Sequence, residues 1–145
     1  MSISVDLKLK ALGYKFKTKP LLVGGKAKEF YGIRKSGPDT DLIVTSGDYN
    51  NLSKLYPNNL ADLWGDLGVK VKGFEIWKTI LLFDYEFLSK GAIEKKDHKI
   101  IFLEKLLFLT SLAIKKPKYL KDTQLIVKKI LEIQYKDFDS SRYEK

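Results

Sequence analysis

Residues 21–26, Leu-Leu-Val-Gly-Gly-Lys, and residues 39–44, Asp-Thr-Asp-Leu-Ile-Val, decide the fold of this chain. Each contains a short apolar run typical of a buried strand, and the first run ends directly in a Gly-Gly turn. Residues 26–31 suit a short helix that begins at this turn, and residues 36–38, Ser-Gly-Pro, form a loop. The order is therefore strand, Gly-Gly, short helix, loop, Asp-x-Asp and strand.

The two aspartates of this stretch indicate a metal site. Asp39 and Asp41 are two residues apart at the head of a strand, so both carboxylates can point to the same face. Carboxylates this close repel each other, and a divalent cation is the usual remedy. Gly24 and Gly25 leave bare backbone N–H groups for a triphosphate, and Lys26 adds a cation there. Alone, an Asp-x-Asp is often a solvated loop and a Gly-Gly pair only a turn, so their order and spacing carry the interpretation.

The whole stretch resembles the signature of the polymerase β-type nucleotidyltransferase superfamily. That signature is a strand ending in Gly-Gly or Gly-Ser, then a short helix and an Asp-x-Asp. The segment is particularly similar to the small bacterial and viral branch that includes the AbiEii-type toxins, which reads Gly-Gly, helix, Tyr-Gly, a basic residue and Thr-x-Asp-x-Asp-Leu. This chain has Tyr31-Gly32, and it departs from the pattern at Gly37, where the threonine would fall.

The resemblance implies a third carboxylate on a later strand. Glu75 is the best candidate, because it alternates with the apolar Phe74 and Ile76, which would face the core. The alternative is a solvent-facing strand glutamate. Asp84 and Glu86 are weaker candidates, since they stand where the strand is expected to end.

The resemblance also implies the chemistry. The chain would be a transferase that moves a nucleoside monophosphate from an NTP, such as ATP, to an acceptor hydroxyl. Two Mg²⁺ ions, or Mn²⁺ in their place, would be held by Asp39, Asp41 and Glu75, which are the expected catalytic and metal-binding residues. Glu75 would help to deprotonate the acceptor. The nucleotide phosphates would be bound by Gly24, Gly25 and Lys26.

The C-terminal similarity to this branch is less specific. Residues 106–113 resemble a helix with the pattern Leu-Leu-x-x-Lys-x-x-Ala, and Lys121-Asp122 resembles a later Lys-Asp helix. In this chain Thr110 stands near the position of the lysine in that pattern, so Lys105 or Lys118 would have to supply the positive charge instead.

The expected fold is α/β or α+β, a small mixed β-sheet flanked by helices with the nucleotidyltransferase fold and a C-terminal helical pair. We expect one domain over residues 1–145, with the sheet core in residues 18–83 and the helical part in residues 99–137. Its expected elements include an interrupted helix over residues 51–63, strands over residues 69–72 and 74–83, and helices over residues 100–114 and 120–135.

Composition narrows the class of protein and partner. The net charge is +9, from 27 basic and 18 acidic residues, which favours a polyanionic partner unless the lysines simply decorate solvated faces. The chain has no cysteine, which excludes disulfides and thiolate metal sites and fits a cytoplasmic location. Its apolar stretches are too short to span a bilayer, so no membrane is expected. The single histidine, His98, stands in a charged turn where we expect it to be solvated. Five aromatic residues could stack bases, but most of them should be core or rim: Tyr49, Tyr56, Trp64, Trp77 and Tyr85.

Three functions remain open at this point. RNA such as tRNA is the favoured acceptor of the transferred nucleotide. The same chemistry on a protein or a small molecule is an alternative, and so is a catalytically idle fold that binds nucleic acid or a partner. A cognate antitoxin or a second protein chain is a further candidate partner.

Overall fold

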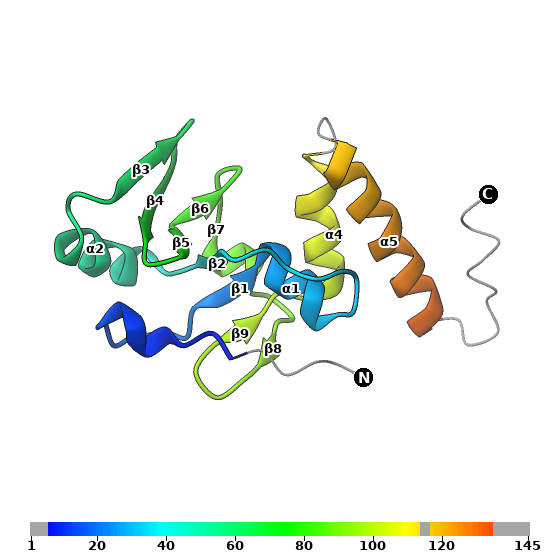
Figure 1. Ribbon diagram of the computed structural model, residues 1–145, viewed down its shortest axis with the longest axis horizontal. Coiled ribbons are helices and arrows are strands. Elements are labelled where there is room, and N and C mark those ends of the chain that lie inside the picture. Colours follow the sequence, from blue (N-terminus) through cyan, green and yellow to red (C-terminus); the bar gives the residue numbers. More distant parts are fainter. Residues whose placement is uncertain (1–5, 114–116, 135–145) are drawn as a thin grey trace. The chain divides into compact units, whose positions relative to one another are not determined.

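The computed structural model describes residues 6–113 and 117–134 of the chain. Its contacts group the residues into two compact units, Met1–Phe102 and Leu103–Lys145. The first unit contains every strand of the described residues, and the second contains two helices (Figure 1).

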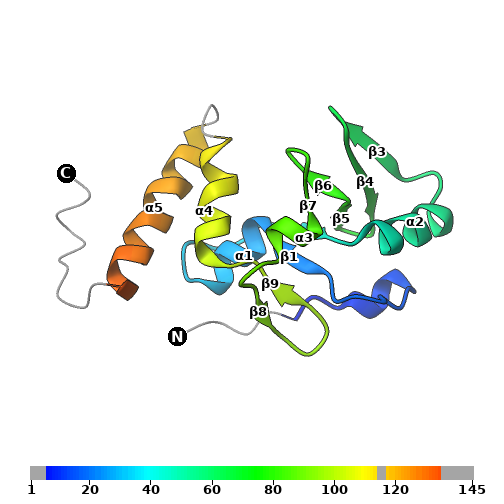
Figure 2. The same cartoon turned by 180° about the vertical axis from the view of Figure 1, so that it is seen from behind.

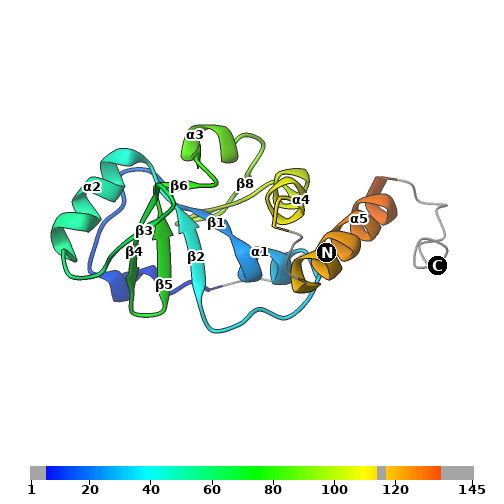
Figure 3. The ribbon, with the colours of Figure 1, turned by 90° about the horizontal axis from the view of Figure 1, so that it is seen from above.

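A seven-stranded mixed sheet forms the centre of the first unit, in the order β3-β4-β5-β2-β1-β9-β8. The middle of this sheet consists of β1 (Leu21–Val23), β2 (Thr40–Ile43) and β5 (Phe74–Trp77). Figure 3 shows these three strands side by side, with β2 antiparallel to β1 and parallel to β5. The outer strands are β3 (Leu60–Leu63), β4 (Asp66–Val71), β8 (Ile93–Glu94) and β9 (Lys99–Ile100). The predicted α+β class is confirmed at this level.

The apolar runs of the central strands form the core. Leu21, Leu22, Leu42, Ile43 and Ile76 have no exposed surface, so both faces of the sheet are covered at its centre. Such strands read as continuous apolar runs and not as alternating ones.

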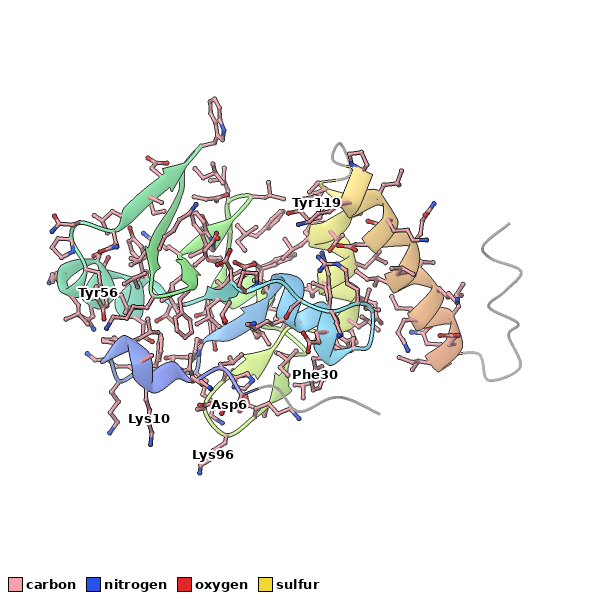
Figure 4. All side chains as sticks on the ribbon, in the orientation of Figure 1. Asp6, Lys10, Phe30, Tyr56, Lys96 and Tyr119 are labelled. Atoms are coloured by element: carbon pink, nitrogen blue, oxygen red, sulfur yellow. The ribbon has the colours of Figure 1, made fainter. Side chains whose placement is uncertain are left out.

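Helices and turns surround the sheet of the first unit. The 3-10 helix η1 (Leu9–Leu12) precedes β1, α1 (Gly24–Phe30) packs against β1 and β2, and α2 (Ser46–Leu55) packs against β4. The N-terminal segment is attached to α2, because the hydroxyl of Tyr56 donates to the carbonyl of Leu12 at 2.6 Å (Figure 4). A separate hairpin of β6 (Thr79–Ile80) and β7 (Phe83–Asp84) leads into α3 (Tyr85–Leu88).

Two of the expected elements are wrong over part of their length. The interrupted helix predicted for residues 51–63 breaks near Pro57 as expected, since α2 ends at Leu55, but residues 60–63 beyond the break are not helical and pair with β4 as a strand. The strand predicted for residues 74–83 ends at Trp77, and the chain then forms the β6–β7 hairpin.

The second unit is a pair of helices packed against each other, α4 (Leu103–Ser111) and α5 (Pro117–Gln134) (Figure 2). Helix α4 begins later than predicted, because residues 99 and 100 belong to β9 and pair with β1. Pro117 is the first residue of α5, a position that needs no backbone donor. Residues 114–116 and 135–137 of the expected helical part lie outside the described residues. Within the described residues, no helix is both long and apolar enough to cross a membrane.

Candidate functional site

The predicted residues meet at the centre of the sheet, where one row of paired positions crosses three strands. Val23 at the end of β1 pairs with Asp41 of β2, and Asp41 pairs with Glu75 of β5. Residues paired across neighbouring strands point to the same face, so both carboxylates lie on one face of the sheet. Asp39 stands directly before β2 and is exposed. We call Val23, Asp41 and Glu75 the carboxylate row.

The turn after β1 is packed closely against Asp41. Gly24 begins α1 with a φ of +67°, and a Cβ built on it would stand 2.2 Å from the Oδ2 atom of Asp41. Only glycine fits both this left-handed conformation and this close approach. The absence of a side chain at Gly24 therefore lets the Asp41 carboxylate lie at the start of α1.

Lysine 70 extends the row on the next strand, β4. Its Cα is paired with that of Glu75, and its Nζ atom lies 4.0 Å from Glu75 Oε1. The same Nζ atom lies 5.7 Å from the ring centre of Trp77, which is 7% exposed. Sequence reasoning missed Lys70, although alternation along β4 opposite Glu75 is a signal that would have found it.

The row does not form a ready-made three-ligand metal site. Among residues 6–113 and 117–134, no group of three or more histidine, aspartate and glutamate side chains is placed to hold a metal ion. The structure thus pairs Asp41 with Glu75 but does not bring Asp39, Asp41 and Glu75 together as one preformed cluster.

The loop of residues 31–39, between α1 and β2, is held to α1 by hydrogen bonds. The carboxylate of Glu29 accepts hydrogen bonds from the Ser36 hydroxyl at 2.6 Å and from the Ser36 backbone N–H at 2.9 Å. These two bonds stabilise the charged form, so they lower the pKa of Glu29 below its ordinary value. Lys26 donates from Nζ to the carbonyl of Gly37 at 3.4 Å. Two neighbouring residues in the second half of the loop, Ser36 and Gly37, are thereby tied to α1.

Gly25 lies beside this loop, and the loop places a second cation, the guanidinium group of Arg34, next to it. A Cβ on Gly25 would lie 3.6 Å from the Cβ of Ser36 and 3.8 Å from Nη1 of Arg34. The guanidinium group of Arg34, one of two arginines in the chain, is thus a neighbour of the Gly-Gly turn. Lys28 is buried one helical turn after Gly24 and therefore lies on the same side of α1. Sequence reasoning missed both cations because their neighbours are set by the path of the loop and by helix packing.

One basic side chain lies elsewhere than predicted. His98 is 5% exposed and not solvated, and its Nδ1 lies 2.6 Å from Asp97 Oδ1. Most of the aromatic residues expected in the core or rim are there, since Tyr49, Trp77 and Tyr85 are buried, whereas Trp64 is 94% exposed at the β3–β4 turn. In the second unit, Thr110 is buried and Lys118 lies over the ring of Tyr119 at 5.1 Å. The replacement of a cation by Lys105 or Lys118 stays a prediction.

Comparison of the chain with protein-family models, with curated proteins and with solved structures finds no match. The geometry of the carboxylate row and its surroundings is therefore the basis on which a function is assigned.

Proposed function

We propose that this chain is a Mg²⁺-dependent nucleotidyltransferase that moves a nucleoside monophosphate from an NTP to an acceptor hydroxyl. The observation that carries the proposal is the carboxylate row, in which Asp41 lies against Gly24 and is paired with Glu75 on the next strand. This arrangement supports phosphoryl chemistry because it sets two acidic oxygen donors beside a backbone turn that has no side chain.

The donors of the row suit Mg²⁺. They are carboxylate oxygens, which a hard cation prefers, and Mg²⁺ commonly binds through one or two carboxylates and completes its shell with water and substrate phosphates. A preformed cage of three protein ligands is therefore not required. Asp41 and Glu75 would hold the ion, with Asp39 two residues before Asp41 in the sequence. When bound, the ion would offset phosphate charge and lower the pKa of the acceptor hydroxyl.

The remaining groups of the site would bind the nucleotide and manage the proton. The backbone N–H groups of Gly24 and Gly25 with the cations Lys26 and Arg34 would hold the phosphates beside α1. Glu75 would accept the proton of the acceptor hydroxyl as its oxygen bonds to the α-phosphorus and pyrophosphate leaves. Lys70, whose Nζ lies 4.0 Å from Glu75 Oε1, would place a positive charge beside that carboxylate.

RNA, such as tRNA, is the acceptor that the charge of the chain favours. A net charge of +9, almost entirely from lysine, provides point charges for a phosphate backbone. A pocket for a cationic small molecule would instead need extra acidic side chains.

One observation favours a second candidate, the catalytically idle fold. Glu75 already has a cationic neighbour in Lys70, and the described residues hold no three-ligand metal group. In this alternative the ion pair replaces the metal, and the basic surface binds nucleic acid without chemistry.

The test is incubation of the purified chain with each α-phosphate-labelled NTP, Mg²⁺ and total cellular RNA. Asp41→Asn and Glu75→Gln remove carboxylates of the row, and Glu104→Gln is the matched control at an exposed position of α4. We expect labelled RNA with the natural chain and Glu104→Gln, and a loss of at least about a hundredfold in rate with Glu75→Gln.

The other outcomes separate the alternatives. Label on protein instead of RNA would move the acceptor to a protein hydroxyl. No transfer to any acceptor, together with RNA binding that is unchanged in Asp41→Asn, would contradict the enzyme and support the idle fold.

A further inference from the structure

The β3 edge of the sheet is open and apolar. Strand β3 pairs only with β4 among the strands of the described residues. Its side chains Leu60 and Leu63 are 51% and 55% exposed, and Trp64 follows at the turn with 94% exposed. Soluble proteins usually protect such an edge with charged side chains, proline, a bulge or a very short strand. Strand β3 is four residues long and has one charged side chain, Asp62, but it has no lysine, proline or bulge.

The backbone of β3 offers a second set of hydrogen bonds. The N–H of Lys70 donates to the carbonyl of Asn59, and alternate residues of an antiparallel strand point their backbone groups to opposite sides. The register of β3 with β4 therefore directs the N–H and C=O groups of Leu60 and Asp62 away from β4. These four groups are the template for one more strand.

Trp64 is held at a position that local folding does not explain. Trp64 and Gly65 form a two-residue turn in which both residues have positive φ, +55° and +97°. Asn-Gly is the usual sequence for such a turn. A large, exposed aromatic residue in this conformation adds strain without filling the core, which points to a contact outside the chain.

The charges around β3 indicate which class of partner would make this contact. Residues 55–69 and 79–89 contain no lysine or arginine, and they include the acidic Asp62, Asp66 and Asp84. β3 and its turn thus offer no cation to a nucleic acid or an anionic membrane, and the lysines that flank this stretch, Lys54 and Lys70, stand on α2 and β4. Two copies of a chain with a net charge of +9 repel each other over most of their surface, but they can approach here.

We propose that two copies of this chain pair their β3 strands antiparallel about a two-fold axis, which joins the two sheets. Leu60 of each copy would exchange both backbone hydrogen bonds with Asp62 of the other. The two Ala61 residues, one from each copy, would then face each other across the two-fold axis. This register uses all four outward groups and keeps the two Asp62 carboxylates from standing opposite each other. It also brings Trp64 to the end of the partner's α2, where Leu55 is exposed. The proposal does not depend on the enzymatic activity.

The absence of cysteine from the chain gives a clean cross-linking test. Residues facing each other at a non-hydrogen-bonded antiparallel pair have Cα atoms about 4.5 Å apart, within the range of a disulfide. Ala61→Cys should therefore form a covalent dimer on mild oxidation. Leu60→Cys is the matched control, because the two copies of residue 60 would be separated by two positions along the strand, beyond about 7 Å.

The oligomeric state of the natural chain gives a second readout. We expect a mass of twice the 16.7 kDa of one chain in light scattering. Leu60→Pro should yield a folded monomer, because it removes an outward N–H and leaves the ladder with β4 intact.

Several results would overturn the self-pairing. They are a monomeric natural chain, a dimer that persists in Leu60→Pro, equal cross-linking of the two cysteine variants, or a monomer whose β3 edge pairs with a strand of another protein.

Discussion

Gly24 lies against the carboxylate of Asp41, so closely that a Cβ on Gly24 would stand 2.2 Å from Asp41 Oδ2. The next residue, Gly25, differs sharply, since its Cβ would meet only ordinary contacts at 3.6 Å and beyond. The two glycines of the turn therefore have different roles, although they look equivalent in the sequence. The first allows Asp41 to reach the start of α1, and the second faces the loop that contains Arg34 and Ser36.

We predict opposite effects of alanine at these two positions. Gly24→Ala should lower the free energy of unfolding by about 2–3 kcal/mol, because it combines a left-handed alanine with a steric overlap on Asp41. Gly25→Ala should be neutral or stabilising by up to about 1 kcal/mol, since alanine is favoured within a helix. Urea unfolding followed by the fluorescence of the buried Trp77, with Trp64→Phe as background, measures both. Equal destabilisation by the two variants would contradict the assignment.

In the proposed metal site, Lys70 would compete with the ion for Glu75. Replacing Lys70 with Met removes a positive charge 4.0 Å from the carboxylate, a Coulomb interaction of about 1 kcal/mol in water. Mn²⁺ should therefore bind Lys70→Met tighter than the natural chain, on the order of fivefold. Lys72→Met is the matched control, because Lys72 lies beyond the end of β4 and its Nζ donates to the carbonyl of Ala11. Titration of free Mn²⁺ by electron paramagnetic resonance measures the affinity, and weaker binding in Lys70→Met would contradict the prediction.

The Glu29–Ser36 contact makes the loop beside the Gly-Gly turn sensitive to acid. Because its pKa is lowered on folding, Glu29 contributes stability that is present above its ordinary value of 4.5 and is lost as the pH falls through the folded pKa. Glu29→Gln should therefore be less stable than the natural chain at pH 7 and should approach it in stability at lower pH. Urea unfolding at a series of pH values, with exposed Glu104→Gln as control, measures this convergence. A difference that does not change with pH would show that Glu29 acts through packing and not through its charge.

Asp66 joins the two hairpins next to the sheet edge. Its carboxylate is buried and accepts from the Thr79 hydroxyl at 2.7 Å and from the N–H groups of Leu81 and Leu82 at 2.7 and 2.8 Å. Asp66→Asn places an amide N–H₂ against these donors and should cost about 2–3 kcal/mol. Asp62→Asn is the matched control, because Asp62 is exposed and its carboxylate accepts from the Gly65 N–H at 2.8 Å. We expect it to cost less than about 1 kcal/mol in the same urea experiment. Equal losses would contradict the role of Asp66.

The sequence predicts the centre of this fold better than its edges. The buried strands at Leu21 and Leu42, and the break at Gly24, follow from apolar runs and glycine punctuation, which are local signals. The pairing of Glu75 with Asp41 depends on strand register, and the strand β3 depends on β4, so both are set by contacts distant in the sequence. The burial of His98 likewise follows from the β8–β9 turn and not from its charged neighbours.

The turn of the β6–β7 hairpin is strained, and this strain can be relieved. Leu81 and Leu82 occupy its two central positions with φ values of +51° and +67°, and both side chains are exposed. A non-glycine residue in the left-handed region costs about 1–2 kcal/mol, and Asn-Gly is the preferred sequence for such a turn.

The double variant Leu81→Asn with Leu82→Gly should therefore raise the free energy of unfolding by about 1 kcal/mol. This increase in stability is smaller than the strain energy of two left-handed leucines, because the variant also loses a contact. Leu82 Cδ2 lies 3.3 Å from the position of a Cβ on Gly65, so the Leu82 side chain packs near the β3–β4 turn. Urea unfolding measures the change. The reversed pair, Leu81→Gly with Leu82→Asn, is the control for composition, and it should gain less because the Asn-Gly order suits the turn better. A loss of stability in the first variant would mean that the contact between the two hairpin turns outweighs the backbone strain, so that the leucines stabilise the fold itself.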